Sequence, residues 1–241
     1  MLVACVLQTC RKWYKHPVPY LIVLSGDDFV KEFGPAGRMT TIGWTAVSRM
    51  LVYKKGGMYG DWEIRWRHIF DLRFVLALMY RSYNLDFEFM NTMMSYEALG
   101  YRLQWTKKLM LPVPMMESWS LYVVDGEERK LLVMDPCLTS GPSGQMQDKH
   151  EDNANFILAG LRRCIHENIA GWYVPAQGWR IEYNVGMHDS STMNYTGLYL
   201  QNVLTPARLN YMRQSIAYEV ISMRGNMGEL PDFMVEEVLP F

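Results

Sequence analysis

Three apolar segments joined by short polar connections constrain the fold of this chain more than any other part of its sequence. They are Lys108 to Val113, Trp119 to Asp125 and Lys130 to Asp135. Short apolar runs bounded by turn residues are typical of β-strands, and the turn sequence Asp-Gly-Glu-Glu between the last two is typical of a hairpin. The sequence therefore predicts a β-hairpin or meander over residues 108–135.

Patterns before and after these strands predict helices. From Asp61 onward, apolar residues recur at helical spacing and form one stripe: Ile69, Leu72, Leu76 and Met79. A second helix is expected to start near Asn153 and to bury Leu158, Leu161 and Ile165.

The last part of the chain is expected to hold one more strand and two more helices. Residues 179–185 alternate as in a half-buried strand, and residues 196–204 read as a buried helix. The final helix is expected to start with Thr205 as cap and Pro206 in its first turn, to stop at Gly225, and to bury Leu209, Met212, Ile216 and Val220.

The first 60 residues have a weaker pattern. Proline- and glycine-containing sequences break this part into short pieces, and one helix is expected around Trp44 to Val52. No internal repeat or domain linker is evident. We therefore predict a poorly defined N-terminal segment over residues 1–60 and one domain over residues 61–241.

The composition excludes several classes of function. The 241 residues are 49% hydrophobic and 20% charged, an ordinary globular balance. A formal net charge of −1 provides no global positive field for nucleic acid or an anionic membrane. The first residues lack the pattern of a secretory signal, and no apolar run is long enough to span a bilayer. We expect a nuclear or cytoplasmic protein that is not secreted and binds neither nucleic acid nor membrane.

The cysteines and histidines do not form a recognisable metal or disulfide pattern. Four cysteines at unrelated spacings indicate free thiols: Cys5, Cys10, Cys137 and Cys164. Cys164 lies on the apolar face of its helix and is expected in the core. A zinc site would have to draw on Cys164, His150, His166 and His188, which lack zinc-ligand spacing. No metal or other cofactor is expected.

A small polar residue and a glycine open the apolar helix expected after residue 195. Thr196 precedes Gly197, and a Ser, Cys or Thr at a helix N-terminus is either a cap or a nucleophile activated by the helix dipole. Earlier in the chain, Ser118 and Trp119 open one strand, and Asp135, 17 residues after Ser118, ends the next.

This order resembles the ubiquitin-like-specific cysteine proteases, the SUMO-protease family with a papain-like core. In that family, the motif His-Trp-x-Leu begins one strand and an Asp ends the next strand. The motif Gln-x-Asn-x-x-Asp-Cys-Gly begins the central helix. The resemblance covers residues 100–225 and assigns four positions: Ser118 to the His, Asp135 to the Asp, Ser190 to the oxyanion Gln and Thr196 to the Cys.

The resemblance implies both a fold and an evolutionary origin for this chain. It implies an α+β, papain-like fold in which helices flank a mixed or antiparallel central sheet. In plants, such domains often occur in longer, transposon-associated proteins, and this chain resembles a degenerate copy of that type.

The positions that differ are those that carry the family's chemistry. A cysteine protease needs a thiolate, an imidazole to move its proton, a carboxylate to orient the imidazole and an amide to stabilise the oxyanion. Only the carboxylate, Asp135, is retained. The resemblance thus implies an inactive pseudoprotease in which Thr196 serves as a helix cap.

Two residues offer alternatives to this interpretation. Cys137 follows Asp135 by two residues and is a candidate relocated nucleophile, although it has no sequence-adjacent base, and a buried or rim thiol is the competing interpretation. His188 lies eight residues before Thr196 and is a candidate substitute base, although nothing in its surroundings fixes its direction of approach.

Three tryptophans allow a second hypothesis from another class of function. Trp119, Trp172 and Trp179 either belong to the core or line a groove for an extended peptide. Members of the family thread a Gly-Gly tail beneath the tryptophan that corresponds to Trp119. The alternative is therefore a binding module for the tail of a ubiquitin-like protein of the SUMO type.

Overall fold

The computed structural model of the chain describes residues 9–34, 37–59, 65–80, 84–115, 118–135, 143–183, 206–232 and residue 234. The chain forms two compact units. One comprises Tyr59–Val203, and the other combines Met1–Met58 with Leu204–Phe241.

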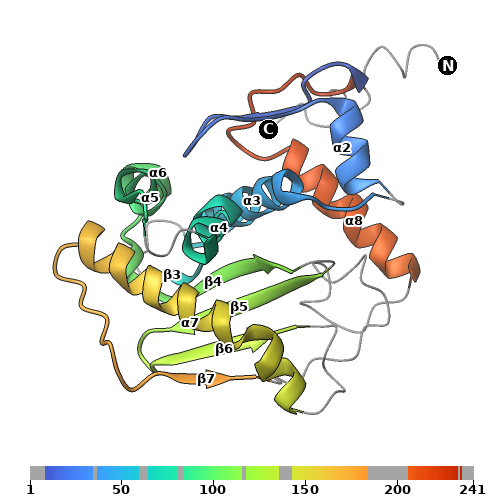
Figure 1. The fold of residues 1–241 in the computed structure, drawn as a ribbon. Coiled ribbons are helices and arrows are strands. Elements are labelled where there is room, and N and C mark those ends of the chain that lie inside the picture. Colours follow the sequence, from blue (N-terminus) through green and yellow to red (C-terminus); the bar gives the residue numbers. More distant parts are fainter. Residues whose placement is uncertain are drawn as a thin grey trace. The chain divides into compact units, whose positions relative to one another are not determined.

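A five-stranded mixed sheet is the centre of the Tyr59–Val203 unit (Figure 1). Its order is β3-β4-β5-β6-β7, with bounds Arg65–Ile69, Thr106–Pro114, Trp119–Asp125, Lys130–Met134 and Arg180–Glu182. The three middle strands pair antiparallel, whereas each outer strand pairs parallel to its neighbour. The predicted meander over residues 108–135 is confirmed, because apolar strands this close in sequence need only short turns to pair.

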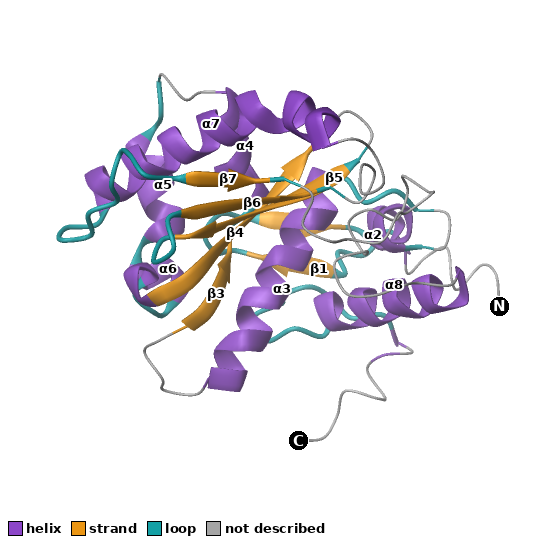
Figure 2. Ribbon diagram, turned by 90° about the horizontal axis from the view of Figure 1, so that it is seen from below, coloured by secondary structure: helices purple, strands orange, loops and turns teal. Residues whose placement is uncertain are grey.

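Two helices, α4 (Leu72–Tyr80) and α7 (Ser143–Asn168), cover one face of this sheet. The unit also contains α5 (Phe87–Met94), which packs on α7, the short α6 (Tyr96–Leu99) and the 3-10 turn η1 (Leu103–Trp105). Figure 2 shows α4 and α7 on the same side of the sheet. The covered face is lined by alternating buried side chains of the middle strands: Leu109, Leu111, Val113, Tyr122, Val124, Leu131 and Val133.

Two helix predictions in this unit need correction. Ile69 is not helical: it ends β3 and pairs with Met110, and the buried residues of α4 are Leu72, Phe74, Val75 and Leu78. A strand followed closely by a helix had produced an accidental helical spacing. The second helix starts at Ser143, ten residues before Asn153. The apolar pattern does not reveal this start, because polar residues form the first turns. Leu158, Leu161 and Ile165 are buried as predicted.

The other unit gives regular structure to much of the N-terminal segment. It contains β1 (Tyr14–His16), β2 (Ile22–Leu24), α2 (Gly26–Phe33), α3 (Thr41–Tyr59) and α8 (Pro206–Ile221). The helix predicted around Trp44 is α3, and α8 starts at Pro206 as predicted but ends at Ile221.

Buried arginines hold the segments of this unit together. Arg213 of α8 donates hydrogen bonds to the carbonyls of Gly34 and Gly37, and Arg49 of α3 donates to that of Tyr20. Val220 is buried as expected, whereas Met212 and Ile216 are half-buried. In the described residues, no helix is both long and apolar enough to cross a membrane.

Candidate active site

The start of β5 and the end of β6 bring two predicted site residues to the same end of the sheet. Leu121 pairs with Met134, so the antiparallel register places Ser120 opposite Asp135. Ser118 directly precedes β5, and its carbonyl accepts a hydrogen bond from the backbone N–H of Met115. All three residues are buried, and Asp135 has no exposure.

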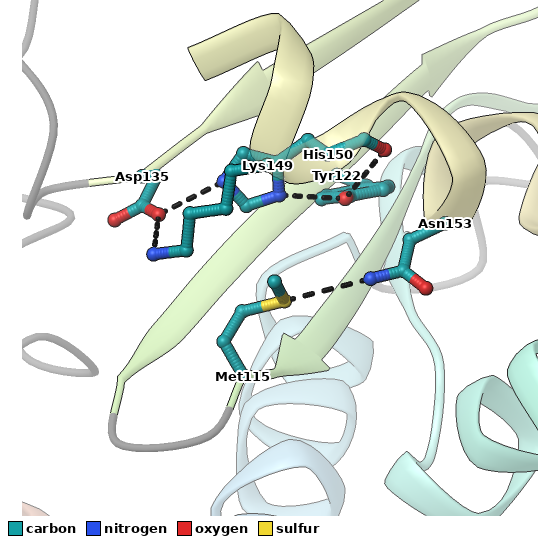
Figure 3. A network of polar contacts seen from close by, with 6 residues as sticks. All are labelled: Met115, Tyr122, Asp135, Lys149, His150 and Asn153. Atoms are coloured by element: carbon teal, nitrogen blue, oxygen red, sulfur yellow. Dashed lines mark hydrogen bonds and ion pairs between the residues drawn. The ribbon is translucent and has the colours of Figure 1, made fainter. Parts of the chain in front are cut away.

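The carboxylate of Asp135 is bound by two consecutive residues of α7 (Figure 3). The Nε2 atom of His150 lies 2.9 Å from Oδ2 of Asp135, and Nζ of Lys149 lies 2.6 Å from the same oxygen. His150 is fully buried, whereas the Lys149 side chain is 31% exposed. One imidazole and one ammonium group therefore compensate for the desolvation of this carboxylate.

The second ring nitrogen of His150 faces the interior. Its Nδ1 lies 2.8 Å from the hydroxyl of Tyr122 on β5, as Figure 3 shows. Since a carboxylate only accepts hydrogen bonds, Nε2 carries a hydrogen, and in the neutral ring Nδ1 accepts from Tyr122. Burial, with added repulsion from the charges of Tyr183 and Asp135, raises the pKa of Tyr122, so the phenol keeps its proton.

We call Asp135, Lys149, His150 and Tyr122 the Asp135 network. It joins β6, α7 and β5 through side chains that are mostly inaccessible to solvent. Both nitrogens of His150 are engaged inside it, so this imidazole has no free nitrogen for accepting a proton from a nucleophile at the surface. The network is suited to holding α7 against the sheet.

A weaker contact ties α7 to the connection between β4 and β5. The side-chain amide of Asn153 lies 3.7 Å from the sulfur of Met115, and the backbone N–H of Met115 donates to the carbonyl of Ser118. The hydroxyl of Ser120 is buried and has no hydrogen-bond partner among the described residues. Ser118 and Ser120 have no imidazole, so the only imidazole seen to bind Asp135 among the described residues is that of His150 on α7.

The remaining predicted residues divide into two groups. Thr196, Ser190, Cys137 and His188 lie outside the described residues. Trp119 is half-buried at the start of β5, on the face of the sheet opposite to that of Asp135.

Cys164 is buried as predicted, and burial raises the pKa of its thiol to about 12. Within the described part of the chain, no three His, Cys, Asp or Glu residues are grouped to hold a metal.

Sequence reasoning missed the role of His150 and Lys149. Both lie in the polar first half of α7, which was not predicted to be helical. From the sequence, His150 is a candidate zinc ligand only. One feature of the sequence indicates this role. His150, preceded by Lys149, lies 15 residues after Asp135 in a segment able to form a helix.

Comparison by sequence found no matching protein-family model and no matching curated protein. Comparison by structure found proteases. SUMO protease Ulp1 with its catalytic cysteine oxidised to a sulfenic acid is similar at a TM-score of 0.59 and 15% identity, over 92% of this chain and 91% of that one. The Ulp1-like SUMO protease catalytic domain of Chaetomium thermophilum gives 0.57 and 14%, over 99% and 91%.

A third solved structure has a bound partner. The C-terminal Ulp1 protease domain in complex with Smt3, the yeast orthologue of SUMO, is similar at a TM-score of 0.56 and 14% identity, over 83% of this chain and 84% of that one. At such identities the likeness shows the fold alone. The chain has the mixed-sheet, helix-flanked fold of Ulp1-like SUMO proteases, as the sequence predicted.

Proposed function

We propose that this chain is a non-cleaving relative of the SUMO proteases, in which the former catalytic carboxylate has become a structural residue. One observation carries the proposal: Oδ2 of Asp135 is bound by His150 and Lys149 of α7. In a cysteine protease this carboxylate orients the catalytic histidine. Here the position assigned to that histidine is Ser118, which has no imidazole.

His150 does not replace the missing base in this proposal. A base must reach the proton of the nucleophile directly or through one water molecule. The two nitrogens of His150 instead face Asp135 and Tyr122, and its side chain has no solvent exposure. With Thr196 at the position of the cysteine, neither the thiolate nor its base remains on this assignment.

We further propose that the partner is a ubiquitin-like protein of the SUMO type. Two features support this: the similar Ulp1 domain was solved in complex with Smt3, and Trp119 is present at the position under which the family threads the substrate tail. Trp119 is half-buried at the start of β5. The proposed location is the nucleus or cytoplasm, where a free buried thiol such as that of Cys164 is expected.

A thiol-reactive SUMO probe tests the loss of activity. SUMO carrying an electrophile at its C-terminus should not label the chain under conditions in which an active SUMO protease is labelled completely. Labelling would be located by mass spectrometry. Stoichiometric modification of Cys137 would overturn the proposal, because it would identify a relocated nucleophile.

A binding assay tests the proposed partner separately. Immobilised chain should retain intact SUMO and should release SUMO that lacks its two C-terminal glycines. The Trp119→Ala variant should lose the preference for the intact tail, and Trp66→Ala, which removes an exposed indole on the edge strand β3, should keep it. Equal retention of both SUMO forms by the unmodified chain would argue against tail recognition.

A further inference from the structure

A cavity of about 300 Å³ lies at the end of the sheet opposite to Asp135. It is bounded by the start of β4, the end of β5 and the last turns of α7. Along α7, Leu161 is eleven residues beyond His150, which corresponds to roughly 16 Å. We call this cavity the tryptophan pocket, after Trp105, Trp172 and Trp179 in its wall.

The walls of the tryptophan pocket are aromatic and aliphatic. Its three indoles are half-buried and come from η1 and from the segment between α7 and β7. Leu161 and Ile165 of α7 are almost completely buried behind them. Indole faces and edges bind other aromatic rings by stacking and edge-to-face contact.

Hydrogen bonds fix the segment that carries two of these indoles. The indole N–H of Trp179 donates to the carbonyl of Pro175 at 2.8 Å, and the backbone N–H of Trp172 donates to that of Ile169 at 3.2 Å. Nε of Arg162 on α7 reaches the carbonyl of Val174 at 3.4 Å. The pocket is therefore formed before a ligand arrives, which lowers the entropic cost of binding.

The charged groups at the pocket favour an anion. Two cationic side chains line it, those of Lys107 and Arg162, against one carboxylate, that of Glu127. The terminal Nη atoms of Arg162 form no hydrogen bond within the described residues, although the side chain is partly buried. A guanidinium group in this situation binds a carboxylate with charge-assisted hydrogen bonds.

We propose that the tryptophan pocket binds a small aromatic carboxylic acid. The ring would lie among the indoles, and the carboxylate would bind Arg162 with Lys107 nearby. The volume is at the lower end of the range for ligand pockets and suits one ring with a short side chain. This proposal does not depend on protease ancestry or on a SUMO partner.

Ligand-observed NMR with 3-phenylpropanoate on the full chain tests the proposal, with 3-phenylpropanamide as the uncharged control. We expect a dissociation constant on the order of 1 mM for the acid and binding about tenfold weaker for the amide. Equal affinity for acid and amide would overturn the proposal, as would absence of binding by the acid at ten times that concentration.

Variants of two adjacent arginines on α7 provide a matched comparison. Arg162→Gln should weaken binding of the acid about tenfold and leave binding of the amide unchanged. Arg163→Gln removes the same charge next to the pocket but outside its lining, and should leave both affinities unchanged. An equal loss in both variants would mean that general charge attraction explains the binding, and would overturn the assignment to the pocket.

Discussion

Asp135 is a carboxyl group without solvent exposure, and its neighbours from α7 determine its role. A buried carboxylate is tolerated only when hydrogen bonds and opposite charge replace its hydration. Lys149 provides the charge, and His150 links the carboxylate to the phenol of Tyr122. Removing His150 should therefore leave Asp135 and Tyr122 each short of one buried hydrogen bond.

His150→Leu should lower the free energy of unfolding by about 2–4 kcal/mol, because Asp135 and Tyr122 each lose a buried hydrogen bond. The matched control is His166→Leu on the exposed face of the same helix, which should change stability by less than about 0.5 kcal/mol. Urea unfolding followed by circular dichroism measures both. A loss of the same size in both variants would show that the Asp135 network contributes nothing specific.

His68 of β3 should make stability dependent on pH. Burial lowers its pKa to about 3, its Nδ1 lies 2.6 Å from the hydroxyl of Tyr101, and its Nε2 has no partner among the described residues. The unfolded chain takes up a proton near pH 6.5 and the folded chain does not, so His68 destabilises the fold as the pH falls below 6.5.

Between pH 7 and pH 5 this effect should cost about 2 kcal/mol. His68→Phe keeps the ring contacts with Phe70 and Tyr101, and should remove that part of the acid destabilisation. His166→Phe, which replaces an exposed histidine, serves as the control. If His68→Phe unfolds with the same dependence on pH as the unmodified chain, His68 does not remain neutral in the folded state.

At the scale of elements, α7 packs closely on α4 at a glycine. A Cβ atom at Gly160 would lie 3.0 Å from Cδ2 of Leu78. Gly160→Val should therefore lower the free energy of unfolding by about 1–3 kcal/mol through overpacking. Ala159→Val changes the exposed neighbouring position and should cost only a few tenths of a kcal/mol. Equal stability of the two variants would contradict the close approach of these helices.

The elements also show why the sequence predicted some parts of this fold and not others. The meander of β4, β5 and β6 was predictable because its apolar residues are close together in sequence and its turns are short. The first half of α7 was missed because polar residues such as Asp148, Lys149 and Glu151 hide a helical pattern. The contact between His150 and Asp135 depends on how that helix crosses β6, and no local pattern encodes this crossing.

At the scale of the whole molecule, restoring the family's residues should not be sufficient for reaction with a SUMO probe. Tyr195 stands where the family motif has the Asp before its Cys. The variant with Ser118→His, Ser190→Gln, Tyr195→Asp and Thr196→Cys should not react with a thiol-reactive SUMO probe, because His150 and Lys149 still bind Oδ2 of Asp135. Adding Lys149→Met, His150→Leu and Tyr122→Phe removes the two contacts to Oδ2 of Asp135, so the histidine introduced at position 118 should bind that oxygen in their place and permit labelling. Labelling before these three changes would show that the network does not block the site.

The most direct measurement is cleavage of a SUMO precursor by the unmodified chain, with a SUMO protease as positive control. The expected result is no product at an enzyme concentration equal to that of the substrate, because Asp135 is bound to α7 and Ser118 provides no base. Appearance of mature SUMO that stops when Asp135→Asn or Cys137→Ala is introduced would contradict it.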